Sequence, residues 1–174
     1  MKKNLKTFGA LFLAASIAFT SCSKNDNASS TLQVKMTDAP GAFSKVNVDI
    51  REVKVKMSDD TSSTSGWITL ATNVGIYDLL QFQNSRDTLI GSGIIPQGSL
   101  KEIRLVLGSN NTVEVLGVVY PLTIPSGSES GLKIKLNKNL NASFETVLID
   151  FDANASVRLE TDGSYKLRPV ITVR

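Results

Sequence analysis

The chain has 174 residues, with 19 lysines and arginines, 16 aspartates and glutamates, one cysteine and no histidine. The lack of histidine excludes Ser-His-Asp catalysis, Cys-His catalysis and every histidine-based metal site. Residues 1–21 contain three lysines and no acid, so the rest carries 16 charges of each sign. With no basic run and no lysines interleaved with aromatics, nucleic-acid binding is excluded as well.

The first 21 residues have the pattern of an export signal, in which three lysines precede an apolar run at residues 8–19. As a helix, this run of 12 residues spans roughly 18 Å, too short for the ~30 Å hydrocarbon layer of a bilayer. The end of the segment, Phe19-Thr20-Ser21-Cys22, resembles the lipobox of bacterial lipoproteins, although Phe19 stands where leucine is usual.

We therefore predict cleavage before Cys22 and lipidation of its sulfur and amine, because two or three fatty chains hold a protein firmly on a membrane. Ser23 stands where an aspartate would favour inner-membrane retention, so we expect the outer membrane, with its periplasmic or surface face left open. Two alternatives remain: ordinary secretion with a free thiol, or an apolar N-terminus that belongs to the fold.

The mature chain is predicted to form one domain. Residues 22–30 are polar and predict a flexible tether, so the fold is expected over residues 31–174. The 153 residues after cleavage suffice for one self-supporting core, and with Cys22 lipidated no thiol is left for a disulfide.

Apolar residues alternate with polar ones from residue 32, which is typical of strands with one buried face. In residues 45–57 the apolar parity changes near Arg51 and Glu52, which predicts one long strand bent by a β-bulge. Asp162-Gly163 predicts a tight turn into a last strand, in which Pro169 requires an edge or a bulge. The other predicted strands are residues 32–36, 67–70, 88–95, 103–107, 112–116, 118–124, 132–136, 146–151 and 157–160, with a short strand or helical turn at 76–82.

Nine or ten short strands and at most one short helix predict an all-β fold, which we expect to be an antiparallel β-sandwich. A Greek key of transthyretin-like or immunoglobulin-like type suits the length, while the order of the strands stays open.

Six sequence blocks in the same order over residues 31–174 resemble the domain of unknown function 4382 family. They are TDAPG at 37–41, YDLL at 77–80, IRLVLGSNN at 103–111, YPLTIPSG at 120–127, DFDA at 150–153 and YKLRPVI at 165–171. The resemblance implies an exported lipoprotein with a β-rich domain, and it implies no activity, since the family's activity is unassigned.

Acidic residues supply the candidate sites. Asp150 and Asp152 share strand parity, so they could form an acid and base pair or half of a cation site, or simply face water beside a buried strand. Asp59 and Asp60 lie in a polar loop that could fold around calcium, although it lacks the EF-hand spacing. Asp38 is expected to accept backbone hydrogen bonds in its turn, with contact to a ligand as the alternative.

Aromatic and modification signals are weaker. Trp67, Tyr77, Tyr120 and Tyr165 are expected to pack in the core, with sugar stacking as the alternative. Thr88, within Asp87-Thr88-Leu89, resembles a bacterial O-glycosylation acceptor.

We predict a non-catalytic, lipid-anchored binding or structural module with no cofactor, no metal and no nucleic-acid partner. A glycan or protein ligand is expected at the loops 58–66 and 125–131. The alternatives are a calcium-stabilised adhesin and an enzyme that uses only carboxylates on a glycoside.

Overall fold

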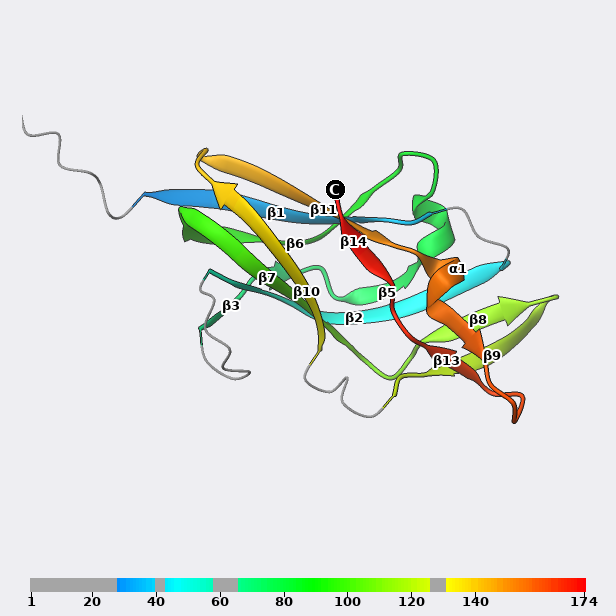
Figure 1. The fold of residues 1–174 in the computed structure, drawn as a ribbon. Coiled ribbons are helices and arrows are strands. Elements are labelled where there is room, and N and C mark those ends of the chain that lie inside the picture. The colour runs from blue at the N-terminus through cyan, green and yellow to red at the C-terminus, as the bar shows by residue number, and fades with distance from the viewer. Residues whose placement is uncertain (1–27, 40–42, 58–65, 126–130) are drawn as a thin grey trace, which may run out of the picture.

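A computed structural model describes residues 28–39, 43–57, 66–125 and 131–174. Within them the chain forms fourteen strands, one 3-10 turn and one helical turn, arranged in two sheets that lie as layers across a shared core (Figure 1). The all-β, sandwich-like fold is confirmed. More strands are present than predicted, in part because the segments at residues 67–72 and 165–173 are each divided between the two sheets.

The smaller sheet has five strands in the order β14-β11-β1-β6-β4. Its strands are β1 (Ser29–Thr37), β4 (Ala71–Thr72), β6 (Thr88–Pro96), β11 (Phe144–Phe151) and β14 (Ile171–Val173). β1 pairs with β11 in parallel and with β6 antiparallel, so the prediction of a purely antiparallel sandwich is wrong. Two parallel strands are joined by a long connection, so they lie far apart in sequence. Side-chain alternation within one segment does not show which distant strand is its partner.

The larger sheet has nine strands and follows the path β10-β7-β2-β8-β9-β13-β12, with β3 and β5 also paired to β2. Its strands are β2 (Lys45–Lys56), β3 (Trp67–Thr69), β5 (Gly75–Asp78), β7 (Gly98–Leu107), β8 (Thr112–Val115), β9 (Val118–Thr123), β10 (Leu132–Leu140), β12 (Val157–Leu159) and β13 (Tyr165–Leu167). β2 is its long central strand, and its register shifts between Ile50 and Glu52, where the bulge was predicted.

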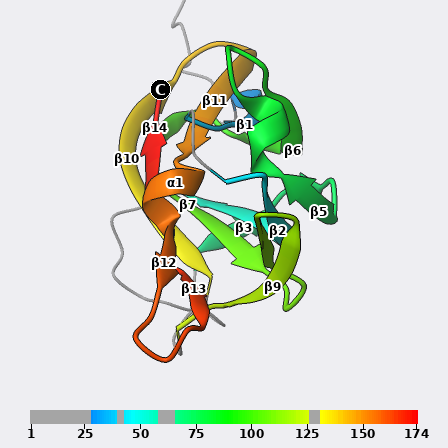
Figure 2. The same cartoon turned by 90° about the vertical axis from the view of Figure 1, so that its right-hand side faces the viewer.

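Two short helical turns connect the layers. The 3-10 turn η1 (Leu79–Phe82) occupies the segment expected to hold a strand or helical turn. The helical turn α1 (Ala153–Ser156) carries the chain from β11 in the smaller sheet to β12 and β13 in the larger one (Figure 2). No helix among the described residues has both the length and the apolar character needed to cross a membrane.

The core fills the space between the sheets. Its fully buried members include Leu32, Met36, Ile50, Leu105 and Phe151. Gly91 contacts this core so closely that an added Cβ would lie 3.0 Å from the Cβ of Val53, so the backbone of β6 approaches β2 without room for a side chain.

Two predicted boundaries are wrong. β1 begins at Ser29 and Ser30 is buried, so the fold starts two residues earlier than the predicted tether allows, because backbone pairing with β6 does not require apolar side chains. The predicted last strand is two strands, β13 and β14, which belong to different sheets and are separated at Arg168, Pro169 and Val170. Proline lacks the N–H that a continuous ladder needs.

Candidate functional site

Three aspartates that are far apart in sequence meet at one end of the smaller sheet. β1 and β11 run in parallel, and Thr37 lies opposite Asp150 in their register. Because parallel strands end at the same edge, Asp38 emerges just after β1 beside the end of β11 and the start of α1. The polar residues at this edge therefore include Asp38, Asp150 and Asp152, and sequence analysis had selected all three as candidates.

Asp38 is only 5% exposed and holds two segments in place. Its Oδ1 accepts a hydrogen bond from the backbone N–H of Ala153 at 2.8 Å, and its Oδ2 accepts one from Nε2 of Gln83 at 3.0 Å. Burial raises the pKa of the Asp38 carboxyl above its ordinary value of 3.8, and the charges of Asp152 and Asp150 add to this effect, while the two hydrogen bonds oppose it. Asp38 accepts a backbone hydrogen bond as predicted, but the donor is Ala153 of α1 and does not belong to the turn that follows Asp38.

Asp150 and Asp152 do not share one water-facing strand surface, so that prediction is wrong. Asp150 is 6% exposed and forms an ion pair through Oδ2 with Arg174, whereas its Oδ1 is buried without a hydrogen-bond partner. Asp152 lies after the end of β11, where its Oδ1 accepts the N–H of Ala155 at 2.8 Å and caps α1. Because β11 ends at Phe151 and α1 follows, Asp152 lies outside the strand and does not follow its side-chain alternation.

A polar cavity of about 340 Å³ opens beside Asp38. Asn84 and Ser85 on its rim have left-handed backbone conformations, with φ of 57° and 65°, which non-glycine residues rarely adopt. Among the described residues, no group of three or more acidic or cysteine side chains could hold a metal ion. The cavity is lined by Thr37, Asp38, Ala39, Asn84, Ser85, Arg86, Asp87, Leu148 and Arg174.

The three carboxylates therefore stabilise the junction of β1, β11, η1 and α1 through hydrogen bonds and an ion pair. Asp38 and Asp152 accept backbone hydrogen bonds, and Asp150 holds the C-terminal arginine. A general acid and base need carboxyl oxygens that can reach a substrate proton. Here Asp38 and Asp152 accept hydrogen bonds from backbone N–H groups and Oδ2 of Asp150 contacts Arg174, while Oδ1 of Asp150 is buried.

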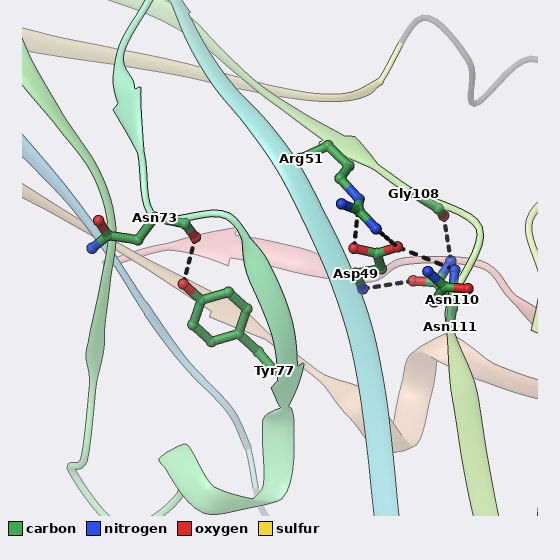
Figure 3. Close-up of polar contacts among 7 residues, drawn as sticks. All are labelled: Asp49, Arg51, Asn73, Tyr77, Gly108, Asn110 and Asn111. Atoms are coloured by element: carbon green, nitrogen blue, oxygen red, sulfur yellow. Dashed lines mark hydrogen bonds and ion pairs between the residues drawn. The ribbon is translucent and has the colours of Figure 1, made fainter.

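A second buried polar network was missed by sequence analysis (Figure 3). Asp49 on β2 is fully buried, and its two carboxylate oxygens contact Nε and Nη2 of Arg51 at 2.7 and 2.8 Å. Its Oδ2 also accepts the N–H of Asn110 at 3.2 Å. Asn111 completes the network, since its Oδ1 accepts the N–H of Asp49 at 2.9 Å and its Nδ2 donates to Gly108 at 2.7 Å.

This network fixes the GSNN turn after β7. An added Cβ on Gly108 would lie 2.2 Å from Oδ2 of Asp49, so only glycine fits against the carboxylate. The turn borders a cavity of about 470 Å³, lined by Leu107, Gly108, Ser109, Asn111, Pro121, Leu122, Thr123 and Ile124. The network was missed because the parity of β2 predicts an outward, exposed side chain for Asp49, whereas Arg51 and the GSNN turn cover it.

The predicted aromatic candidates have different environments. Tyr77 and Tyr165 are half-buried against the core, as expected. Tyr120 is more exposed, and its ring centre lies 5.1 Å from that of Tyr165 with the two rings tilted by 46°. Tyr77 donates its hydroxyl to the carbonyl of Asn73 at 2.5 Å (Figure 3). The prediction that Trp67 packs in the core is wrong: it lies opposite Lys56 on the outer face of the larger sheet.

The remaining predicted positions are less informative. Thr88 is the half-buried first residue of β6, and its glycosylation stays a prediction. Cys22, Asp59 and Asp60 lie outside the described residues, as do most of the loops expected to bind a ligand.

A family model described as Domain of unknown function (DUF4382) matches residues 29–169. The chain belongs to this family. Searches of curated proteins and of solved structures found no match.

The DUF4382 match begins with the first residue of β1 and ends at Pro169, so it covers all strands except β14. Asp38, Asp49, Asp150 and Asp152 lie inside the matched region, whereas Arg174 lies beyond it. The resemblance predicted from the six sequence blocks is thereby confirmed, and the family description assigns no activity.

Proposed function

We propose that this DUF4382 protein is a lipoprotein of the outer membrane, anchored by fatty chains on Cys22, whose β domain is a non-catalytic binding or structural module. The observation that carries the proposal is the arrangement of lysines, apolar run and Phe19-Thr20-Ser21-Cys22 at the N-terminus. β1 begins at Ser29, so the cysteine stands close before the domain. That is the position an anchor requires.

The bonding of the acidic cluster supports a non-catalytic role. Asp38, Asp150 and Asp152 all bond to groups of the protein itself, and the sequence contains no histidine that could act as a general base. A carboxylate-only enzyme would require a different arrangement. Replacing Asp150 and Asp152 together should change the stability of the protein and abolish no hydrolase activity.

Fractionation of Gram-negative cells tests the anchor. The full-length protein should remain with the membranes after a high-salt wash and should incorporate labelled palmitate. Cys22→Ala should lose the label and appear in the soluble fraction, because no thioether can form. A wild-type protein that is soluble and unlabelled would contradict the proposal.

A binding role has one specific candidate location, the cavity beside the GSNN turn. Its volume of about 470 Å³ falls within the size range of small-ligand sites, and it combines apolar Leu107 and Ile124 with polar Ser109 and Thr123. Such a mixed lining suits a sugar, which has both hydroxyls and apolar faces.

A glycan array probed with the mature protein tests this second candidate. Thr123→Trp should block the cavity and abolish any glycan signal, whereas Thr172→Trp, at an exposed position on β14, should not. A glycan signal that survives Thr123→Trp would exclude this cavity as the binding site.

A further inference from the structure

The outer face of the smaller sheet carries exposed apolar side chains at the end where the chain enters the fold. Thr31 on β1 lies opposite Ile94 on β6 and, on its other side, opposite Phe144 on β11. Cross-strand partners project to the same side of a sheet, so these three side chains form one row. Ile94 is 75% exposed and Phe144 is 55% exposed. Pro96, which lies opposite Ser29, is exposed as well, and we call Ile94, Pro96 and Phe144 the entry patch.

Core packing does not explain the entry patch. The core is filled by the residues of opposite parity on the same three strands, which include the buried Leu32, Ile95 and Val147. Single exposed apolar residues are common on protein surfaces. Here, however, two of them flank the same residue of β1, whereas the next row of the face is polar and consists of Thr146, Gln33 and Ser92.

The part of the face around the entry patch is free of charged residues. The first charged residue on the outward side of β1 is Lys35, which lies beyond the polar row and forms an ion pair with Asp87 at 3.1 Å. Glu145 follows Phe144 but has the opposite parity, and it pairs with Lys138 at 3.5 Å. This end of the face can therefore leave water without burying a charge. Its described outward residues are Ser29, Thr31, Gln33, Ser92, Ile94, Pro96, Phe144 and Thr146.

Hydrogen bonds fix the start of β1 beside the entry patch. The N–H of Thr31 donates to the carbonyl of Ser143, and the N–H of Gln97 donates to the carbonyl of Ala28, both at 2.8 Å. The start of β1 is therefore held between the end of β6 and the start of β11 (Figure 1). Residues 22–28 reach at most about 25 Å even when fully extended, so a lipidated Cys22 would keep this end of the domain at the bilayer surface.

From this arrangement we propose that the entry patch inserts into the interfacial layer of the bilayer that holds the anchor. The inference rests on the proposed lipidation of Cys22. Apolar side chains at a membrane surface are buried about 5–10 Å deep, at the boundary of headgroups and acyl chains. The tether raises the effective concentration of lipid at the patch, so a small apolar area suffices. Insertion would direct the β8–β9 hairpin, at the far end of the molecule, away from the bilayer (Figure 1).

A fluorophore at residue 31 measures the contact. Cys22 is the only cysteine in the chain and lipidation would occupy its sulfur, so Thr31→Cys supplies the only thiol for labelling. The labelled protein, isolated from membranes, is reconstituted into phosphatidylcholine vesicles whose lipids carry a nitroxide quencher high on the acyl chain. We expect quenching at residue 31 that added salt does not reduce, because the contact is apolar. A label on Thr172→Cys, exposed on β14 at the other end of the same sheet, should not be quenched.

The test variant is Ile94→Ser/Phe144→Ser, made in the Thr31→Cys protein. The matched control is Val118→Ser/Val119→Ser, which removes exposed apolar area from β9, since these valines are 51% and 61% exposed. The test variant should lose the quenching at residue 31, and the control should keep it. Circular dichroism of each variant checks that the fold is retained. The comparison of the labels at residues 31 and 172 leaves the entry patch unchanged, so it decides the question even where the test variant does not fold.

The outcomes separate this inference from the anchor. Protein that floats with the vesicles but shows equal quenching at residues 31 and 172 overturns insertion and leaves the anchor intact, as does quenching that survives in the test variant. Protein that does not float with the vesicles overturns the anchor and the inference together. A label at residue 31 that is shielded from aqueous iodide but not quenched by the nitroxide lipid would show that a second copy of the chain covers the entry patch, and would refute insertion.

Discussion

Asp38 accepts the backbone N–H of Ala153 at 2.8 Å, so one buried carboxyl joins the end of β1 to the first residue of α1, 115 positions later. The same side chain accepts Nε2 of Gln83, which follows η1. Two hydrogen bonds to a single aspartate therefore connect three secondary-structure elements, β1, η1 and α1. Its burial and its bonds indicate a role in stability.

Asp38→Ala should lower the free energy of unfolding by about 1–3 kcal/mol, because it leaves the buried N–H of Ala153 without an acceptor. Urea denaturation of the purified protein measures the change. Asp87→Ala is the control, since Asp87 is exposed and makes only a surface ion pair with Lys35 at 3.1 Å. The control should cost about 0–1 kcal/mol. Equal effects of the two variants on the free energy of unfolding would refute the stabilising role of the Asp38 hydrogen bonds.

The raised pKa of Asp38 predicts a pH dependence of stability. A carboxyl with a folded-state pKa above its unfolded value binds protons more readily in the folded protein. Its contribution is therefore fully present below the unfolded value, near 3.8, and is lost as pH rises through the raised pKa.

Wild type should accordingly gain stability relative to Asp38→Asn as the pH falls from neutrality toward 4. Urea titrations of both proteins across this range provide the measurement. Other carboxyls titrate in both proteins and cancel in the difference. A difference in unfolding free energy that stays constant with pH, or that grows with rising pH, would contradict the assignment.

Gly108→Ala should destabilise the GSNN turn, because the new Cβ would lie 2.2 Å from Oδ2 of Asp49 and 2.6 Å from Nε of Arg51. Overpacking of this kind typically costs about 1–3 kcal/mol. Gly75→Ala is the matched control, since its nearest neighbour in Tyr77 is 3.6 Å from the new Cβ. Thermal unfolding should show a lower Tm for Gly108→Ala alone, and an unchanged Tm would show that the turn is not constrained by Asp49.

Sequence patterning predicted the features that depend on neighbouring residues. The change of parity near Arg51 located the bulge of β2, and the break between the predicted strands 112–116 and 118–124 located the turn of the β8–β9 hairpin. These features follow from side-chain alternation and from backbone conformations that glycine adopts readily, which are local properties.

The features that the sequence pattern did not predict depend on contacts between residues that are distant in sequence or that cover one another in the fold. The parallel register of β1 and β11 brings Asp38 to Asp150, and no local signal in either strand specifies the partner. Trp67 lies on the outer face because Arg104, from another strand, covers its ring and replaces the core as its packing partner. Asp49 is buried because its charge is compensated by Arg51 and by the N–H of Asn110.

Calcium should leave the Tm unchanged relative to a chelator. Calcium binds six to eight oxygens, and no group of three or more acidic side chains among the described residues could hold a metal ion. Differential scanning calorimetry with calcium and with EDTA makes the comparison, since an ion that binds the folded state raises stability. A rise in Tm that disappears in Asp59→Asn/Asp60→Asn would reveal a calcium site and contradict this prediction.

The mass of the N-terminal peptide of the mature protein tests the central claim most directly. Lipid anchoring predicts a peptide that begins at Cys22 and carries a diacylglycerol on the sulfur and an acyl chain on the amine. A peptide in which Cys22 has a free thiol and a free amine, or one that still contains residues 1–21, would contradict the account.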